Sequence, residues 1–135
     1  MHRPREPGAM RPLRIVDSIT ELGPDDAGCI AVSGSHGGVS AARYAAAARP
    51  WLSAFNDAGV GRDQAGIAGL ARLQDDGLAA CAVAHDSARI GDARSSHDDG
   101  IISHVNAHAA ALGLRPGQRL RDAVDLIQAF PGDKP

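Results

Sequence analysis

A chain of 135 residues with 44% hydrophobic residues, 22% charged residues and a formal net charge of −2 is large enough for one domain with its own core. Aromatic residues make up only 3% and the arginines are scattered, so we expect no nucleic-acid partner. No stretch approaches the roughly 18 apolar residues of a membrane span. Residues 1–16 lack the apolar centre of a signal peptide, so a cytoplasmic protein without membrane contact is predicted.

The single lysine and the two cysteines limit the chemistry further. A pyridoxal phosphate enzyme needs a lysine for its Schiff base, and a P-loop for nucleotides needs one directly after its glycines. The only lysine is Lys134, so neither cofactor is expected. Cys29 and Cys81 stand in apolar runs without CxxC spacing, which favours two buried thiols over zinc ligands or a disulfide scaffold.

The two ends of the chain differ in composition from its middle. Residues 1–12 contain three prolines and three arginines, which is typical of a flexible arm. Residues 131–135 form a loose tail, which leaves 13–130 as a single domain. That domain starts with 13–20 (LRIVDSIT), a pattern typical of a first strand at the edge of a sheet.

The stretch 28–49 predicts a strand, a glycine-rich turn and a helix. Cys29 to Val32 form a continuous apolar run, typical of a parallel strand that is covered on both faces. The polar turn SGSHGG (33–38) leads into an alanine-rich helix over 40–49, which Pro50 ends. The unpaired N–H groups and the dipole at the start of such a helix suit an anion.

The same order recurs downstream. Apolar runs at 51–55 and 78–84 predict two more strands, each followed by a loop of His, Asn, Asp, Ser and Gly. Between them lies an amphipathic helix with Asp63 as its expected N-cap. Two further helices are predicted, over 100–112 and 120–130.

Strands that alternate with helices imply right-handed βαβ crossovers. We therefore predict a single small α/β domain, with two or three layers and a mostly parallel four-stranded sheet. The alternation resembles small flavodoxin-like or swivelling β/β/α domains, which occur as small subunits or mobile domains of lyases and dehydratases. This resemblance is one of fold, and it carries over no residue.

Parallel strands place their carboxyl ends at one edge of a sheet, so the three polar loops are predicted to form one small-molecule site. The expected catalytic residues are His36, Asp57, His85 and Asp86. The expected ligand-binding residues are Ser33, Ser35, Gly37, Gly38, Asn56, Gly59, Ser87, Arg89 and Asp92.

One chemistry for such a site is metal-free acid–base catalysis. His36 or His85 would act as the base and Asp57 or Asp86 would orient it, while Arg89 would clamp a carboxylate or phosphate. In a variant of this scheme a loop serine, Ser35 or Ser87, is the nucleophile, although the GxSxG motif is only approximated.

Two other interpretations remain open. Residues His36, Asp57 and His85, with Asp86 beside them, offer nitrogen and oxygen ligands that suit Zn²⁺, Mn²⁺ or Fe²⁺. Alternatively the chain is a non-catalytic ligand-binding module, or a small subunit that completes a partner's active site.

We expect a hydrolase or lyase that acts on a small anionic metabolite bearing a carboxylate or phosphate. The short sheet with open edges and many small side chains favours a homo-oligomer. His104 and His108 stand four residues apart on the predicted helix 100–112, where we expect them at a helix surface or an interface.

Overall fold

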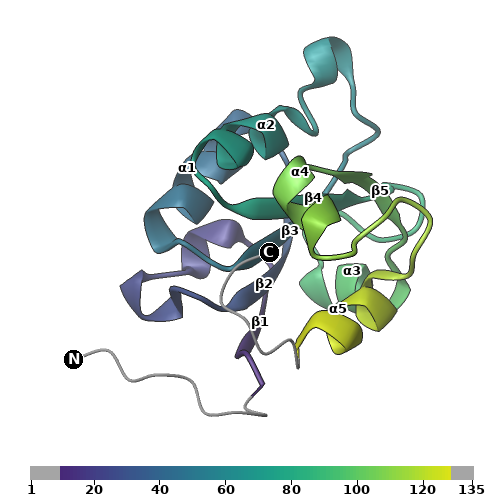
Figure 1. The fold of residues 1–135 in the computed structure, drawn as a ribbon. Coiled ribbons are helices and arrows are strands. Elements are labelled where there is room, and N and C mark those ends of the chain that lie inside the picture. The colour runs from purple at the N-terminus through teal and green to yellow at the C-terminus, as the bar shows by residue number, and fades with distance from the viewer. Residues whose placement is uncertain (1–9, 129–135) are drawn as a thin grey trace.

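The computed structural model describes residues 10–128, and its centre is one five-stranded sheet (Figure 1). The strands lie side by side in chain order: β1 (Leu13–Val16), β2 (Ile30–His36), β3 (Leu52–Asn56), β4 (Ala79–Val83) and β5 (Ile102–Val105). The first four are parallel, and β5 runs antiparallel to β4. The predicted single α/β domain with a mostly parallel sheet is confirmed, with five strands instead of four.

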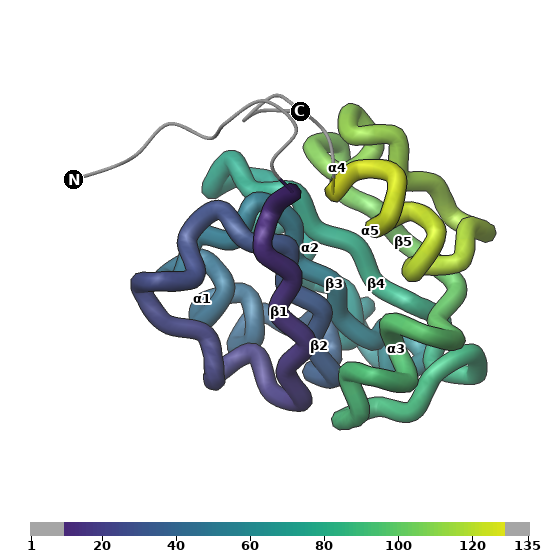
Figure 2. Tube along the Cα trace, turned by 90° about the horizontal axis from the view of Figure 1, so that it is seen from below, coloured from purple at the N-terminus to yellow at the C-terminus, as the bar shows by residue number. Residues whose placement is uncertain are grey.

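Helices cover both faces of this sheet, so the domain has three layers. The helices are α1 (Val39–Ala48), α2 (Ala68–Asp75), α3 (Ala93–Asp99), α4 (Ala107–Ala111) and α5 (Leu120–Gln128), with short 3₁₀ turns η1 (Ile19–Glu21), η2 (Pro24–Asp26) and η3 (Arg62–Gln64). Figure 2 shows α1 on one side of the strands and α3 and α5 on the other. Among residues 10–128, no helix has the length and apolar character needed to cross a bilayer.

The continuous apolar runs contribute side chains to two hydrophobic cores, one on each face of the sheet. In β3, Leu52 and Ala54 belong to the core shared with α4 and α5, whereas Phe55 belongs to the core under α1 and α2. Alternating side chains of one strand thus point to opposite faces, and both faces are buried. Five of the ten buried residues of the second core are alanines, which lets α1 approach the sheet closely.

The order of the strands differs from the flavodoxin-like arrangement. In that arrangement the first strand lies between the second and the third. Here β1 is an outer strand that pairs with β2, as predicted for the first strand. The predicted strand 13–20 is shortened to Leu13–Val16, because Ser18 caps the turn η1. The flavodoxin-like resemblance is therefore not confirmed.

The predicted helix over 100–112 is wrong. Its first half is strand β5 and its second half is helix α4, while α3 occupies a segment that the sequence indicated as loop. The free edge of β4 offers unpaired backbone N–H and C=O groups, and residues 102–105 pair with them. The β-branched Ile102 and Val105 in this segment suit a pleated surface. Asn106 then caps α4 by accepting a hydrogen bond from the backbone N–H of Ala109.

The predicted glycine-rich turn 33–38 is also corrected, because β2 continues through it to His36. Gly34 is buried within this extension, and a Cβ there would lie 2.5 Å from the backbone N of Asp92 and the backbone C of Gly91. The glycine is thus needed for close approach of the loop after β4 rather than for a turn.

Asp63 does not cap a helix as predicted. It lies exposed in η3 with φ of 55°, and α2 begins only at Ala68, after an N-cap at Ile67 that makes no side-chain hydrogen bond. The chain between β3 and α2 is therefore a longer loop than the sequence indicated.

The predicted arm 1–12 and tail 131–135 lie mostly outside the described residues. Within the arm, Arg11 is buried and its guanidinium stacks on the ring of Trp51 at 3.7 Å. The backbone N–H of Arg11 also donates to the carbonyl of Gln128, which joins the two ends of the described chain.

Candidate functional site

The loops that follow β2, β3 and β4 adjoin one another at the carboxyl edge of the sheet. The buried side chain of Asn56, at the end of β3, links two of them. Its Nδ2 donates to the carbonyl of Ala88 at 3.2 Å, and its Oδ1 accepts from the backbone N–H of Ala58 at 2.8 Å. The backbone N–H of Gly91 donates to the carbonyl of Gly34 at 2.7 Å, which attaches the loop after β4 to β2.

Asp57 lies at the centre of this edge with 4% of its surface exposed. Its Oδ1 accepts hydrogen bonds from the backbone N–H groups of Gly59 at 2.8 Å and His85 at 3.0 Å. Its Oδ2 accepts one from the hydroxyl of Ser103 at 2.7 Å. One carboxylate therefore connects β3, the loop after β4 and strand β5.

The pKa of Asp57 is held below its ordinary value. Burial by itself raises this pKa, but the hydrogen bonds from Ser103, Gly59 and His85, together with the charge of His85, outweigh that effect. Asp57 is therefore negatively charged at neutral pH.

The imidazole of His85 lies beside this charge. Its Nδ1 is 3.5 Å from Oδ1 of Asp57, which is longer than a close hydrogen bond, and the contact is an ion pair only when the ring is protonated. The ring packs over Gly59, where a Cβ would lie 3.6 Å from it. The His85 side chain is 59% exposed, and because Nδ1 faces Asp57, Nε2 is the nitrogen available to a ligand.

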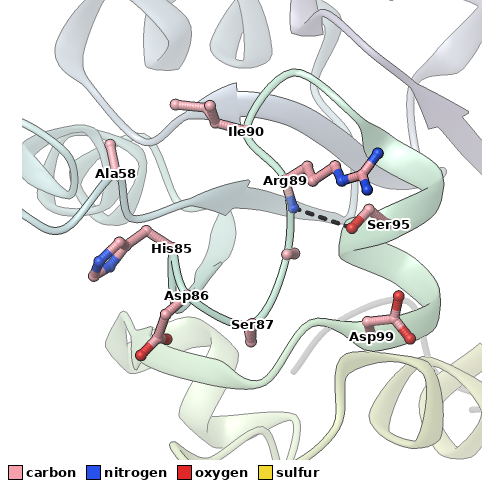
Figure 3. A pocket seen from close by; sticks show the side chains of 9 residues that line it. Ala58, His85, Asp86, Ser87, Arg89, Ile90, Ser95 and Asp99 are labelled. Carbon is pink, nitrogen blue, oxygen red and sulfur yellow. Dashed lines mark hydrogen bonds between the residues drawn. The ribbon is translucent and has the colours of Figure 1, made fainter.

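His85 lines a cleft of about 550 Å³ between the loop after β4 and helix α3 (Figure 3). The other lining residues are Ala58, Asp86, Ser87, Ala88, Arg89, Ile90, Ser95 and Asp99. Arg89 is the only arginine or lysine among the residues that line this cleft. Its guanidinium and the carboxylates of Asp86 and Asp99 form no ion pair with any of residues 10–128. The cleft thus combines an imidazole, one guanidinium and two carboxylates.

Three of the predicted binding residues support the wall of this cleft. The Ser87 hydroxyl donates to the carbonyl of Ala84 at 2.7 Å and accepts from the backbone N–H of Ile101 at 2.9 Å, so it is not poised as a nucleophile. Asp92 caps α3 by accepting from the backbone N–H of Ser95. The Ser95 hydroxyl in turn accepts from the backbone N–H of Arg89 at 3.0 Å, the dashed line in Figure 3.

His36 is not brought into the cleft with His85. It lies exposed at the end of β2 and lines a separate hollow of about 180 Å³ against α1, together with Ser35 and Tyr44. The Ser35 hydroxyl accepts from the backbone N–H of Ile19 at 3.0 Å. The two predicted bases therefore open onto different surfaces.

Ser33, Gly37 and Gly38 serve the packing of the fold. The Ser33 hydroxyl is fully buried and donates to the carbonyl of Ala54 at 3.0 Å. The carbonyl of Gly37 accepts from the backbone N–H of Gly69 at 2.8 Å. A Cβ on Gly69 would lie 2.3 Å from the carbonyl oxygen of Gly38, so small residues let α1 and α2 meet at their N-terminal ends.

The candidate metal ligands are not assembled in the described structure. Among residues 10–128 there is no group of three or more His, Cys, Asp or Glu side chains placed to share an ion. Cys29 and Cys81 are buried free thiols, as expected. Burial, with a smaller contribution from Asp26, raises the pKa of Cys29 to about 11, and burial raises that of Cys81 to about 12.

The loop between β3 and α2, which starts at Asp57, has unusual backbone φ angles. Ala58, Val60 and Gln64 all have φ between 52° and 67°, a left-handed region that β-branched residues such as valine rarely adopt. Gly66 closes the loop, and a Cβ there would lie 1.8 Å from the carbonyl oxygen of Asp57. Such strained segments concentrate at functional sites.

Sequence reasoning missed Ser103 and misplaced His104. Both belong to β5, and Ser103 contacts Asp57 directly. The run Ile101 to Val105, with three β-branched apolar residues after Gly100, is the signal that favours a strand over a helix.

Comparison of the chain with models of known protein families, with curated protein sequences and with solved structures finds no match in any of the three. The fold and the site therefore define the protein only as a three-layer α/β domain with a carboxylate–imidazole pair at the carboxyl edge of its sheet.

Proposed function

We propose that the protein is a small-molecule enzyme, a hydrolase or lyase, in which His85 acts as the general base. The observation that carries this proposal is the contact between His85 and the buried, charged Asp57. The carboxylate holds both the backbone and the ring of the histidine. A buried carboxylate that orients an imidazole stabilises the imidazolium formed when the base takes a proton.

In this scheme Nε2 of His85 removes a proton from a water molecule or from a carbon next to a carboxylate. Asp57 keeps Nδ1 facing inward and remains charged throughout, as its lowered pKa favours. The contact of 3.5 Å shortens in the substrate complex, since catalytic hydrogen bonds are often long in the free enzyme. General base catalysis of this kind supplies about 10²- to 10⁴-fold in rate.

Arg89 is the proposed anchor for the anionic group of the substrate. Arg89 lines the same cleft as His85, with its guanidinium on the side of α3 and the His85 ring on the side away from α3 (Figure 3). The guanidinium has no carboxylate partner among residues 10–128, so it is available for a two-pronged contact with a carboxylate or phosphate. Asp86 and Asp99 on the same cleft would repel a second negative charge nearby. A substrate with one compact anionic group therefore fits best.

The exposure of the cleft supports a second candidate, a subunit or binding module that is completed by another chain. The His85 side chain is 59% exposed, so water reaches the base freely unless a neighbour covers it. The neighbour we favour is a second copy of the chain, because β1 and β5 are outer strands of the sheet. Light scattering that gives a monomer at working concentration would contradict this part of the proposal.

A metal-assisted reaction with Zn²⁺, Mn²⁺ or Fe²⁺ stays a prediction, and it would require His36 to move out of its separate hollow to join Asp57 and His85. Elemental analysis of the purified protein, with melting curves before and after chelation, tests it. A stoichiometric metal whose removal lowers Tm would favour this route over the metal-free one.

The direct test is a screen of p-nitrophenyl acetate, p-nitrophenyl phosphate and small β-hydroxy acids for turnover. We expect His85→Gln to lower kcat/KM about 10²- to 10⁴-fold, whereas His108→Gln, on α4 and outside the cleft, leaves it unchanged. Anionic probes that bind, depend on Arg89 and are recovered unchanged would point to the binding module. Probes that neither react nor bind at the cleft would overturn the proposal.

A further inference from the structure

A second imidazole lies on the other side of Asp57. Nδ1 of His104, on β5, is 2.9 Å from the hydroxyl oxygen of Ser103 and 3.9 Å from Oδ2 of Asp57. The His104 side chain is 37% exposed. The carboxylate thus faces His85 with one oxygen and, through Ser103, faces His104 with the other.

The direction of these hydrogen bonds follows from counting protons. A serine hydroxyl carries one proton, and an ionised carboxylate only accepts. The Ser103 proton goes to Oδ2 of Asp57 at 2.7 Å, which is closer than the alternative acceptor, the carbonyl of Ala82 at 3.4 Å. The Ser103 oxygen must then accept from His104, so Nδ1 of His104 carries a proton. In the neutral ring, Nε2 is left as an acceptor.

His104 lines a hollow of about 360 Å³ that is separate from the cleft of His85. It lies between α2 and the segment that joins β5 to α4, and its other lining residues are Gln64, Ile67, Ala68, Leu70, Ala71, Gln74, Val105, Asn106 and Ala107. This lining contains no Asp, Glu, Lys or Arg side chain, in contrast to the cleft. The hollow therefore suits a ligand with an apolar body and no net charge.

We propose that this hollow is a second ligand site, which takes an uncharged small molecule with an apolar body and one hydrogen-bond donor. Nε2 of His104 accepts from that donor, and the chain from His104 through Ser103 to Asp57 strengthens the acceptor by placing a negative charge behind it. The site goes beyond the acid–base function proposed for the cleft, although both share Asp57.

The hydrogen-bond chain is tested without any ligand, by nitrogen-15 NMR of the histidine rings in the full chain. We expect neutral His104 to carry its proton at Nδ1, and Ser103→Ala to move the proton toward Nε2. Ser40→Ala, an exposed serine on α1, is the matched control and leaves the His104 spectrum unchanged. A wild-type ring protonated at Nε2, or one indifferent to Ser103→Ala, overturns the proposed chain.

Binding is tested with phenol, an apolar ring with one donor, against benzoate of similar size but negative charge. Phenol is expected to shift the amide signals of Leu70 and Val105, and His104→Leu to weaken its Kd about fivefold, the effect of one lost hydrogen bond. His108→Leu, outside the hollow, leaves Kd unchanged.

Equal binding of benzoate, or no shift at Leu70 and Val105, overturns the ligand class or the site. Neither result bears on the cleft, because the turnover test with His85→Gln uses different residues. The failure of this inference and the failure of the proposed function are therefore distinguishable.

Discussion

Oδ1 of Asp57 accepts a hydrogen bond from the backbone N–H of His85 at 3.0 Å and lies 3.5 Å from Nδ1 of the same residue. A single oxygen thus contacts both the backbone and the imidazole of the residue that begins the loop after β4. The other oxygen of the carboxylate is held by Ser103. Asp57 therefore stabilises the fold and also contacts the proposed base His85. Variants are needed that distinguish an effect on stability from an effect on activity.

Asp57→Asn is expected to lower the free energy of unfolding by about 1–3 kcal/mol. The amide oxygen can replace Oδ1, but the amide nitrogen cannot accept from the half-buried Ser103 hydroxyl, which loses a charged partner. Urea unfolding followed by circular dichroism measures the change. Asp125→Asn, an exposed residue of α5, is the control and should change stability by less than about 0.5 kcal/mol. Equal effects of the two substitutions would contradict the central place of Asp57.

Stability should fall in acid partly through Asp57. Its pKa in the folded protein lies below the ordinary value of 3.8, so the folded state binds fewer protons than the unfolded state in this range. This contribution is complete above the unfolded pKa, and it is lost as pH falls through the folded pKa. Urea unfolding at a series of pH values from neutral to strongly acid should show a shallower loss in Asp57→Asn than in the wild type. Parallel curves would show that Asp57 does not contribute.

Gly34→Ala is expected to destabilise the fold by about 1–3 kcal/mol, as overpacking does. The new Cβ would lie 2.5 Å from backbone atoms of Gly91 and Asp92. Backbone atoms cannot rotate aside as the end of a flexible side chain could. Because those residues follow the cleft loop, the signals of His85 and Arg89 should shift as well. Gly23→Ala is the matched control, since no heavy atom beyond its two chain neighbours lies within 4 Å of a Cβ there. A wild-type melting curve for Gly34→Ala would refute the close approach.

The two thiols should be unreactive in the native protein. Burial raises the pKa of Cys29 to about 11 and that of Cys81 to about 12, so almost no thiolate exists near pH 8, and both residues are buried. A chromogenic disulfide reagent should detect both thiols only in denaturant. Rapid reaction of one thiol without denaturant would mean that the domain opens locally around that cysteine.

Most of the parallel sheet followed from local pattern. The apolar runs around Ile30, Phe55 and Cys81 are long enough to be strands, contain no breaking residue and are followed by polar loops. They form adjacent parallel strands in the structure. The edge position of the first strand and the last amphipathic helix were predictable for the same reason, because periodicity and turn residues act over a few neighbours.

Strand β5 was not predictable in this way. Residues 102–105 pair with the edge of β4, a partner about twenty residues earlier in the chain, and that pairing outweighs the helical spacing of Ile101 and Val105. The error also concealed Ser103 and placed His104 beside His108 on a helix that does not exist.

The sequence by itself determined that polar residues follow three apolar strands, and that these loops contain histidines and aspartates. Only the tertiary structure decided their roles, because burial and hydrogen bonding depend on partners remote in the chain. Asp57 is enclosed by three donors, whereas Asp86 is exposed beside the same histidine. His36 ends β2 on the side of α1, away from the cleft that His85 lines. The histidines and aspartates in a loop indicate what chemistry is available. Packing against other strands decides which of these histidines and aspartates lie together in a site.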